Sequence, residues 1–402
     1  MSNVKQPLLY LCHRIPYPPN KGDKIRSFNQ LAYLSQHFDV YLGCFVDDPS
    51  DMGYTKELSK YVKGMYVLPL NKRHATFRGV LRMGRRRPIT LPYYFDPKMA
   101  QWVNNTIAKF AIRNVLVYCS SMAQYVDSPQ YQRLNRVIDF VDLDSDKWRQ
   151  YAKKQNFPMS WVYNREFRTL LAYEQQLTEH FDASVFISSN EIELFCKLSS
   201  ISSHSRIHAV SNGVDLEFFD PKAVTDSTDQ QHTPTVVFTG AMDYWANIDA
   251  VRWFVKHVWP YVTKQVKNAR LMIVGSNPSD KIIELGAFPN IEVTGKVDDI
   301  RSYIRAGWVS VAPMRIARGV QNKVLEAMAM EIPVVATSLA MEGLAKTNGC
   351  NVAIEDNEQH FANAVVAGLK KRQIATENRQ WVVKNYRWEE QLQHLKTLLT
   401  RT

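Results

Sequence analysis

The chain has 402 residues, of which 45% are hydrophobic and 22% are charged. This length allows two domains of ordinary size, and the composition is typical of a packed globular protein and excludes a disordered one. The net charge of +11 leaves three kinds of partner open: nucleic acid, an anionic membrane surface, or small molecules that carry phosphate.

Three further features bear on the cellular setting. No apolar run approaches the ~18 residues that a membrane-spanning helix needs. Residues 1–10 lack the cleavage pattern of a signal peptide and instead predict a first strand. The five cysteines are scattered, which predicts reduced thiols and no disulfide framework or structural metal site. We therefore expect a cytoplasmic protein.

Short apolar runs alternate with longer amphipathic stretches, a pattern typical of α/β proteins with parallel sheets. The predicted strands of the first half are Leu8–Cys12, Val40–Val46, Met65–Leu70, Asn114–Cys119, Val137–Val141 and Ser184–Ser188. Those of the second half are Val236–Thr239, Arg270–Val274, Ile291–Thr294, Val309–Ala312 and Pro333–Ala336.

A polar segment with two prolines, 220–234, lies between the halves and predicts a surface linker. We predict two doubly wound, Rossmann-like domains that face one another across a cleft, at residues 1–205 and 206–385. A C-terminal helix within 386–402 is expected to pack back toward the first domain.

The loop after the first predicted strand, 12–26, contains three prolines and then the run Lys21-Gly22-Asp23. Glycine lets the backbone approach a phosphate or an acceptor, and Lys21, Lys24 and Arg26 would supply positive charge. A proline-rich structural turn with solvated lysines would give the same pattern, so both interpretations stay open.

A basic run extends from Arg82 to Arg87 and is followed by the aromatic triplet Tyr93-Tyr94-Phe95. Cations beside interfacial aromatic rings suit an anionic headgroup layer, so we expect a peripheral membrane contact here. A solvated basic loop is the alternative.

The fifth predicted strand ends in four carboxylates, at positions 139, 142, 144 and 146. Carboxylates at a strand end are candidates for binding an acceptor or acting as a general base, in the order Asp142, Asp144, Asp139. The stretch lacks the glycine and the glutamate of a calcium loop, so we predict no metal there. An acidic loop that caps a helix is the alternative.

The segment 309–337 carries the strongest signal, because it combines a strand, a basic loop, a helix and a second strand. The helix is predicted to begin at about Val320 and to end near Met330, ahead of Pro333. Its N-terminus would expose unpaired N–H groups that bind anions, and Gly319 would let a ligand approach the backbone.

Charged side chains flank this helix start. Arg315 and Lys323 can add charge-assisted hydrogen bonds to a phosphate. Glu326 lies three residues after Lys323 on the same helix face, where its carboxylate can accept the paired hydroxyls of a ribose. A plain surface pair between Lys323 and Glu326 is the alternative.

These residues resemble the nucleotide-sugar signature of retaining glycosyltransferases of the GT-B fold, in the large family four. That signature is a helix of the form G-x-x-x-K-x-x-E-A-M-A followed by a P-V-V-A-T strand, and here it begins at Gly319. The resemblance implies that Glu326 binds the ribose, and that Lys323 and Arg315 bind the diphosphate. Arg318 stands where the family usually has a first glutamate that touches the donor sugar, and it is our candidate at that position.

A glycine turn later in the chain resembles another element of the same family. Gly240 and Asp243 lie in a loop that follows a predicted strand and opens a helix, an arrangement that suits a phosphate or the sugar. Many relatives carry an Arg and a Lys in this loop, whereas 240–247 has neither. Arg315 and Lys323 would then supply more of the charge.

The next two predicted strand ends, at Gly275 and Lys296, also resemble the family, in which the second often touches the nucleotide base. Family-four enzymes often have a histidine after the fourth strand, near the anomeric carbon. This chain has Tyr118-Cys119-Ser120-Ser121 there, so His13 is the nearest alternative as a catalytic residue. The block around His13 also resembles sugar transferases of PEP-CTERM/exosortase exopolysaccharide systems.

The resemblances imply an enzyme that moves a sugar from a nucleoside diphosphate sugar, with UDP or GDP as the nucleotide, to a saccharide or polyprenyl-linked acceptor, with retention. No bound cofactor or metal is expected, because cations and helix N-termini would stabilise the leaving diphosphate. Two alternatives remain. One is a nucleotide-sugar epimerase of GT-B-like fold, and the other is a basic nucleic-acid-binding protein, for which no recognition motif is found.

Overall fold

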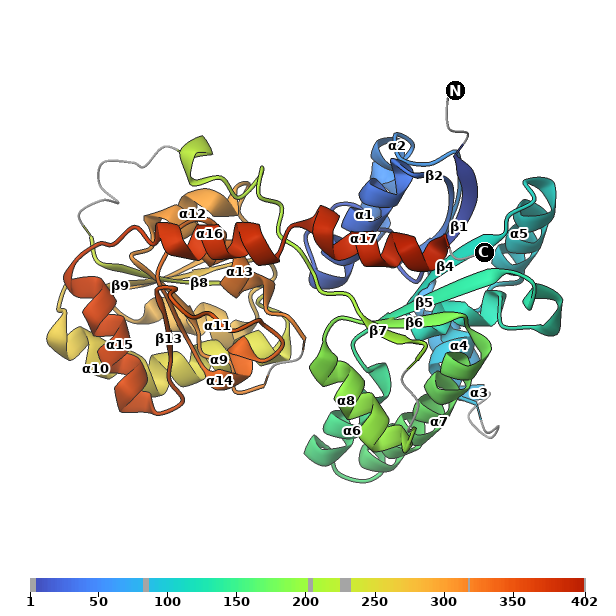
Figure 1. The fold of residues 1–402 in the computed structure, drawn as a ribbon. Coiled ribbons are helices and arrows are strands. Elements are labelled where there is room, and N and C mark those ends of the chain that lie inside the picture. The colour runs from blue at the N-terminus through green and yellow to red at the C-terminus, as the bar shows by residue number, and fades with distance from the viewer. Residues whose placement is uncertain (1–4, 82–86, 202–204, 225–232, 317–318, 401–402) are drawn as a thin grey trace. The chain divides into compact units, whose positions relative to one another are not determined.

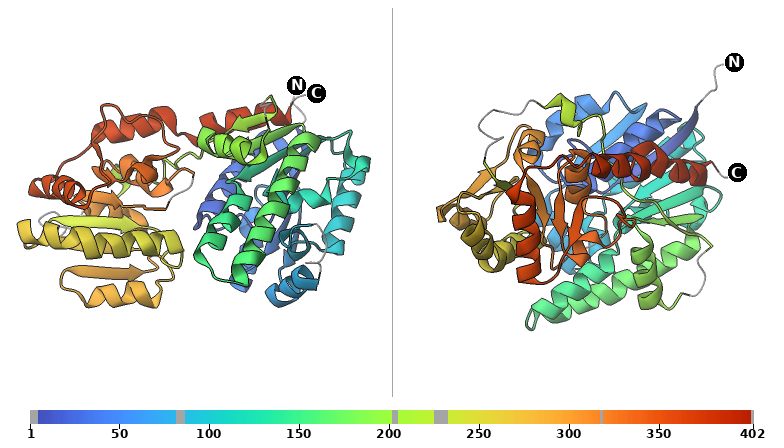
Figure 2. Two further views of the ribbon diagram at one scale, coloured as in Figure 1. Left: turned by 90° about the horizontal axis from the view of Figure 1, so that it is seen from below. Right: turned by 60° about the vertical axis from the view of Figure 1, so that its left-hand side comes forward.

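The computed structural model describes residues 5–81, 87–201, 205–224, 233–316 and 319–400 (Figure 1). The chain divides into two compact units. Unit 1 comprises Met1–Ser211 together with Glu389–Thr402, and unit 2 comprises Asn212–Trp388. Each unit contains one parallel sheet with helices on both faces (Figure 2). The predicted α/β fold with doubly wound sheets is therefore confirmed.

Unit 1 contains a seven-stranded parallel sheet in the order β3-β2-β1-β4-β5-β6-β7. Its strands are β1 (Gln6–Cys12), β2 (Phe38–Val46), β3 (Gly64–Pro69), β4 (Asn114–Tyr118), β5 (Asn135–Val141), β6 (Ala183–Phe186) and β7 (Ile207–Ala209). All five residues of β4 are buried, as expected for a parallel strand that is covered on both faces.

The helices of unit 1 are α1 (Gly22–Ser35), α2 (Thr55–Leu58), α3 (Lys72–Leu81), α4 (Thr90–Tyr93), α5 (Pro97–Lys109), α6 (Asp144–Lys154), α7 (Met159–His180) and α8 (Ser189–Ser199). The last helix of the chain, α17 (Trp388–Leu399), belongs to unit 1 from Glu389 onward. Its leucines are buried, and Asn135 Nδ2 in β5 donates to the Leu398 carbonyl at 3.1 Å. The end of the chain therefore packs on the sheet that its beginning forms.

Unit 2 contains a six-stranded parallel sheet in the order β10-β9-β8-β11-β12-β13. Its strands are β8 (Thr235–Thr239), β9 (Arg270–Val274), β10 (Ile291–Gly295), β11 (Val309–Ala312), β12 (Val334–Ala336) and β13 (Val352–Ile354). Its helices are α9 (Trp245–Trp253), α10 (Trp259–Gln265), α11 (Asp280–Ile283), α12 (Ile300–Ala306), α13 (Asn322–Ala329), α14 (Ser338–Met341), α15 (Glu358–Lys370) and α16 (Thr376–Asn385), with a π-helical turn at Phe254–Val258.

The sequence-based prediction missed two strands and misplaced one helix start. The missed strands, β7 and β13, have three residues each and lie at sheet edges. Helix α13 begins at Asn322 and not at Val320, because Gln321 still has an extended backbone (φ −84°, ψ 96°).

The strand order reverses at one place in each sheet. In unit 1, strand β1 lies between β2 on one side and β4 on the other. In unit 2, strand β8 likewise lies between β9 and β11. Loops at the carboxyl ends of two such neighbouring strands diverge, and ligands of doubly wound proteins bind in the crevice between them. These two edges, β1–β4 and β8–β11, are the places to examine for a site.

Candidate functional site

The β8–β11 edge of unit 2 brings two helix N-termini to one place. The loop after β8 leads into α9, and the loop after β11 leads into α13. In neither helix does the residue before the first turn cap the backbone N–H groups with its side chain. A helix N-terminus without a side-chain cap favours a bound anion, through its backbone N–H groups and through the helix dipole.

The amine of Lys323 lies between these two loops. Its Nζ donates to Asn247 Oδ1 at 2.5 Å and lies 3.7 Å from Met314 Sδ. The same amine is 4.3 Å from the centre of the Phe238 ring. Asn247 Nδ2 in turn donates to the Ala241 carbonyl at 2.9 Å. Asn247 therefore fixes both the amine and the loop, a role that sequence analysis did not find.

The signal for that role was present in the sequence. Asn247 occupies the third position of α9, within the apolar face of the helix, and it is buried. A buried amide side chain needs hydrogen-bond partners, so a polar residue on an apolar helix face points to a specific contact.

Lys323 and Glu326 share a partly buried environment on α13. Burial lowers the pKa of Lys323 to about 7, against the opposing attraction of Glu326. Burial likewise raises the pKa of Glu326 to about 7, against the attraction of Lys323. Because a nearby anion favours the ammonium form, a bound diphosphate would restore the charge that burial disfavours.

Two glycines allow the loops after β8 and β9 to touch. A Cβ on Gly275, whose φ is +156°, would lie 1.7 Å from the Gly240 carbonyl oxygen. A Cβ on Gly240 would lie 2.7 Å from Asn247 Nδ2 and 3.3 Å from Lys323 Nζ. Only glycine fits at either position without displacing the amine or the loop. Gly319, with φ 57°, marks a left-handed turn ahead of α13.

The other predicted residues of unit 2 lie around this centre. Arg315 is half exposed and makes a bidentate pair with Asp249 of α9, from Nε at 3.0 Å and from Nη2 at 2.6 Å. Asp243 accepts from Asn277 Nδ2 at 3.4 Å. Lys296 is exposed after β10, two strands away from β8.

Two further predicted residues of unit 2 contribute little to this picture. Val320 is buried and has an apolar side chain, so any contact with a ligand would come from its backbone. Arg318 lies outside the described residues.

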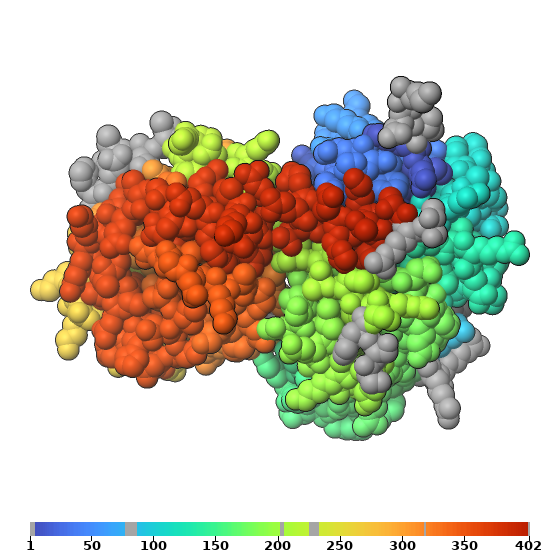
Figure 3. Space-filling view, viewed as in Figure 1, coloured from blue at the N-terminus to red at the C-terminus, as the bar shows by residue number. Residues whose placement is uncertain are grey.

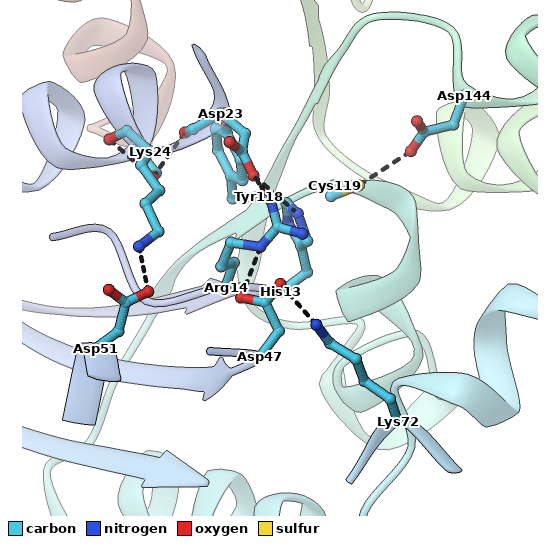
Figure 4. A network of polar contacts seen from close by, with 11 residues as sticks. His13, Arg14, Asp23, Lys24, Asp47, Asp51, Lys72, Tyr118, Cys119 and Asp144 are labelled. Atoms are coloured by element: carbon cyan, nitrogen blue, oxygen red, sulfur yellow. Dashed lines mark hydrogen bonds and ion pairs between the residues drawn. The ribbon is translucent and has the colours of Figure 1, made fainter. Parts of the chain in front are cut away.

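The β1–β4 edge of unit 1 holds a second cluster, centred on Asp23 (Figure 4). Arg14 Nη1 donates to Asp23 Oδ2 at 2.5 Å, and His13 Nε2 lies 3.6 Å from the same oxygen. The His13 ring is stacked at 5.8 Å on Tyr118, whose hydroxyl donates to the Asp23 carbonyl at 2.8 Å. Arg14 also pairs with Asp47 at 3.0 Å through Nε.

Asp23 is the carboxylate that His13 and Arg14 of this cluster contact. Burial alone would raise its pKa, but the hydrogen bond from His13 and the positive charge of Arg14 hold the pKa well below its usual value. The carboxylate thereby orients the His13 imidazole at the carboxyl end of β1. Lys21 and Gly22 precede it at the start of α1, and space remains open in front of Gly22.

Two cations that were expected to face a ligand do not do so. Lys24 Nζ pairs with Asp51 at 2.5 Å, and Arg26 Nε pairs with Asp139 at 2.8 Å, with all four side chains buried. The expectation that Lys24 and Arg26 supply charge to a bound ligand is therefore wrong. Their charges are neutralised inside unit 1.

The four carboxylates at and after the end of β5 also have different surroundings. Asp139 is fully buried against Arg26, and Asp146 binds Gln150 Nε2 at 2.8 Å as well as Arg149. Asp142 and Asp144 are partly buried, and Cys119 Sγ lies 3.1 Å from Asp144 Oδ2. Asp142 and Asp144 thus remain the candidates at this edge, whereas Asp139 belongs to the core.

The backbone at the ends of β4 and β5 is unusual. Cys119 has φ 79° and the β-branched Val141 has φ 66°, a left-handed conformation that side chains other than glycine rarely adopt. Such conformations cost about 1–3 kcal/mol each and cluster at functional sites. Within the described ranges, no group of three His, Cys, Asp or Glu side chains has the arrangement of a metal site.

The aromatic triplet after the basic run packs against the core. Tyr93, Tyr94 and Phe95 are partly buried, Phe95 stacks on Tyr125 at 6.0 Å, and the Tyr125 hydroxyl donates to the Tyr94 carbonyl at 2.6 Å. The triplet therefore does not present an interfacial aromatic surface, contrary to the expectation. Of the basic run itself, Arg87 is exposed, and 82–86 lie outside the described residues.

Comparison with known proteins finds a family model that matches part of unit 2 and solved structures that share the fold of the chain. Residues 233–371 match the family model described as glycosyl transferases group 1. A sucrose-phosphate synthase from Thermosynechococcus elongatus superposes with a TM-score of 0.69 at 16% identity, covering 98% of each chain. WaaG, a glycosyltransferase involved in lipopolysaccharide biosynthesis, superposes with a TM-score of 0.65 at 13% identity, covering 98% of this chain and 100% of WaaG.

Two further relatives bear on ligand and context. The Anabaena protein HepE, solved in complex with UDP and glucose, has a TM-score of 0.66 at 13% identity, over 98% of this chain and 99% of HepE. An uncharacterized 44.6 kDa protein in the cps region of Klebsiella pneumoniae is 24% identical over 398 residues, covering 92% of this chain and 94% of that protein. The chain has the GT-B fold, its unit 2 carries a group 1 glycosyltransferase domain, and the protein is a glycosyltransferase.

Proposed function

We propose that unit 2 binds a nucleoside diphosphate sugar at the β8–β11 edge. The observation that carries the proposal is the position of the Lys323 amine, which Asn247 holds between the N-termini of α9 and α13. The diphosphate would lie against this amine and the two helix N-termini, with a further charge from Arg315. Glu326, one turn further along α13, would accept the two ribose hydroxyls.

This arrangement suits the departure of a diphosphate from the anomeric carbon. As the bond from that carbon to the diphosphate oxygen breaks, negative charge grows on the oxygen, and the Lys323 ammonium and the helix N-termini stabilise it. The acceptor hydroxyl oxygen forms the new bond and gives up its proton. We propose transfer with retention at the anomeric carbon, and Arg318 as the contact to the donor sugar.

We propose UDP as the nucleotide, because HepE shares the fold and was solved with UDP. We propose a role in exopolysaccharide synthesis, which the relative in the cps region supports. The acceptor would be a saccharide or a polyprenyl-linked saccharide held at the β1–β4 edge of unit 1. There His13, oriented by Asp23, and Asp142 are the candidates for binding the acceptor hydroxyl or accepting its proton.

Thermal denaturation with added nucleotides tests the donor site. UDP, GDP, UMP and uridine are compared, since a ligand that binds only the native state raises its melting temperature with concentration. We expect the largest shift from UDP. Absence of any shift from every nucleoside diphosphate would show that the donor site is wrongly placed.

The ribose assignment is tested with Glu326→Gln, with Glu342→Gln as a control at an exposed position of the same unit. Loss of a charged hydrogen bond should weaken UDP binding by roughly 1–3 kcal/mol, which is about 5- to 150-fold. Unchanged affinity in a folded Glu326→Gln protein would refute the assignment of the ribose to this carboxylate.

A further inference from the structure

The tip of the hairpin formed by α6 and α7 exposes large apolar side chains. Phe157 is 81% exposed, Trp161 is 56% exposed and Met159 is 41% exposed. These three side chains lie within five residues of one another, in the connection between the helices and the first turn of α7. Single exposed apolar residues are ordinary, but a concentrated group of this kind marks an interaction surface.

The same hairpin tip is strongly basic. Residues 147–165 contain five Lys or Arg and no Asp or Glu. Lys153 and Lys154 at the end of α6 are exposed directly beside the apolar group. An apolar tip within a purely cationic stretch is complementary to a surface that is anionic outside and apolar beneath.

Aromatic side chains of α6 and α7 pack against one another next to the tip. The Trp148 ring lies 5.4 Å from Tyr163 and 5.8 Å from Tyr151, and the two tyrosine rings are 5.9 Å apart. These contacts join α6 to α7 one to two turns behind the exposed group. The tip is therefore presented by two helices that are packed together, and not by an isolated loop.

The hairpin also adjoins the end of the basic run at Arg87. Arg165 Nη2 donates to the Arg87 carbonyl at 3.2 Å, and the Glu166 carboxylate accepts from the backbone N–H of Ile89 at 2.7 Å. Arg165 lies one helical turn after Trp161. Figure 1 labels α7 and α3 at the lower side of unit 1, and Figure 3 shows in space-filling form the face of this unit that is turned toward the viewer in Figure 1.

We propose that the α6–α7 tip is a docking site for an anionic lipid bilayer. Phe157, Met159 and Trp161 enter the boundary between headgroups and acyl chains, while Lys153 and Lys154 lie against the lipid phosphates. In the part of the chain that the structure describes, no helix is long and apolar enough to cross a membrane. A few apolar side chains and several cations give reversible attachment, and the proposal deepens the proposed function by placing the enzyme where a polyprenyl-linked acceptor lies.

Vesicle sedimentation tests this docking directly. The full-length protein is mixed with phosphatidylcholine vesicles that contain or lack 30% phosphatidylglycerol, at about 50 mM and about 500 mM salt, which change the screening length severalfold. We expect binding only to the anionic vesicles and mainly at low salt. Lys153→Gln with Lys154→Gln should weaken that binding roughly 30-fold, and Phe157→Ser with Trp161→Ser at least tenfold.

Matched controls change the same properties elsewhere on the surface. Lys56→Gln with Lys60→Gln removes two exposed cations from another part of unit 1, and Phe288→Ser with Ile374→Ser removes two exposed apolar side chains from unit 2. Both controls should bind vesicles as the wild type does. The UDP-induced thermal shift should be the same in hairpin and control variants, so a failure of the donor site is seen separately.

Three outcomes would overturn the proposal. The wild type could fail to bind anionic vesicles, the hairpin variants could bind as tightly as the wild type, or the control variants could lose binding equally. A hairpin variant that loses self-association in light scattering, with vesicle binding unchanged, would identify the tip as a contact between copies of this chain.

Discussion

Replacing Lys323 with methionine should stabilise the free protein and weaken its binding of a nucleoside diphosphate. Burial lowers the pKa of the Lys323 amine to about 7, so the folded state at neutral pH holds a charge that it disfavours. Methionine has a similar length and no charge, and its sulfur would lie near Met314, whose sulfur is 3.7 Å from the native amine.

The size of the expected gain in stability follows from the pKa of Lys323. A fall from 10.5 to about 7 disfavours the ammonium by roughly 4 kcal/mol at neutral pH, because each pH unit is worth ~1.4 kcal/mol. The variant loses the hydrogen bond to Asn247 and the contact with the Phe238 ring, about 2 kcal/mol together. A net gain of about 2 kcal/mol should raise the melting temperature of unit 2 by roughly 4–8 °C.

The gain in stability of Lys323→Met over the wild type should become smaller as the pH rises. The folded-state pKa of Lys323 lies below its unfolded value, so the unfolded chain binds more protons between about pH 7 and pH 10.5. Wild-type stability therefore rises with pH through this window, and the advantage of Lys323→Met shrinks. At pH 6 the raised pKa of Glu326 keeps its carboxyl mostly protonated, so removal of Lys323 leaves little unpaired charge.

Differential scanning calorimetry at pH 6, 8 and 10, with and without UDP, measures both effects. Lys264→Met, at an exposed position of α10, is the control and should change stability by less than about 0.5 kcal/mol. We expect Lys323→Met to melt highest at pH 6 and to lose most of its UDP-induced shift. A variant that is less stable than the wild type at pH 6 and still binds UDP equally well would refute the reasoning.

Three other substitutions are informative. Arg315→Ala should weaken UDP binding without changing uridine binding, measured by calorimetric titration; equal losses for both ligands would contradict a role at the diphosphate. Gly275→Ala should destabilise unit 2 by about 3 kcal/mol or more in chemical denaturation, because the new Cβ would overlap the Gly240 carbonyl. Asp23→Asn should lower the melting temperature of unit 1 at pH 7, and the difference should shrink in strong acid as Asp23 becomes protonated, since its folded pKa is lowered well below the usual value and the stabilisation exists only above it. A difference that persists in acid would assign the loss to packing.

The long apolar strands and the charged face of α13 could be predicted because their signals are local. The strand at Arg270–Val274 has the predicted bounds, and the helix at Trp388–Leu399 lies within the predicted range 386–402, since each is set by the residues within it. The spacing of Lys323 and Glu326 places both on one helix face, and the structure holds them there. The three-residue edge strand at Val352–Ile354 carries too little pattern to be seen.

Long-range pairs could not be predicted in the same way. Arg26 looked like a free cation in a loop, but its partner Asp139 is 113 residues further along the chain. Tyr94 looked like a surface aromatic next to a basic run, but it packs against a core built from distant strands. The contact between Lys323 and Asn247, 76 residues apart, is equally invisible until the sheet order of unit 2 is known.

The central claim is that the Lys323 amine receives the diphosphate, and proton uptake on binding tests it most directly. At pH 8 an amine with a pKa of about 7 is roughly 90% neutral, and a bound diphosphate would protonate it. Calorimetric titration with UDP, in two buffers of different ionisation enthalpy, gives the number of protons taken up. The account predicts an uptake approaching one proton in the wild type and almost none in Lys323→Met. Tight binding with no proton uptake, or equal uptake in the variant, would contradict it.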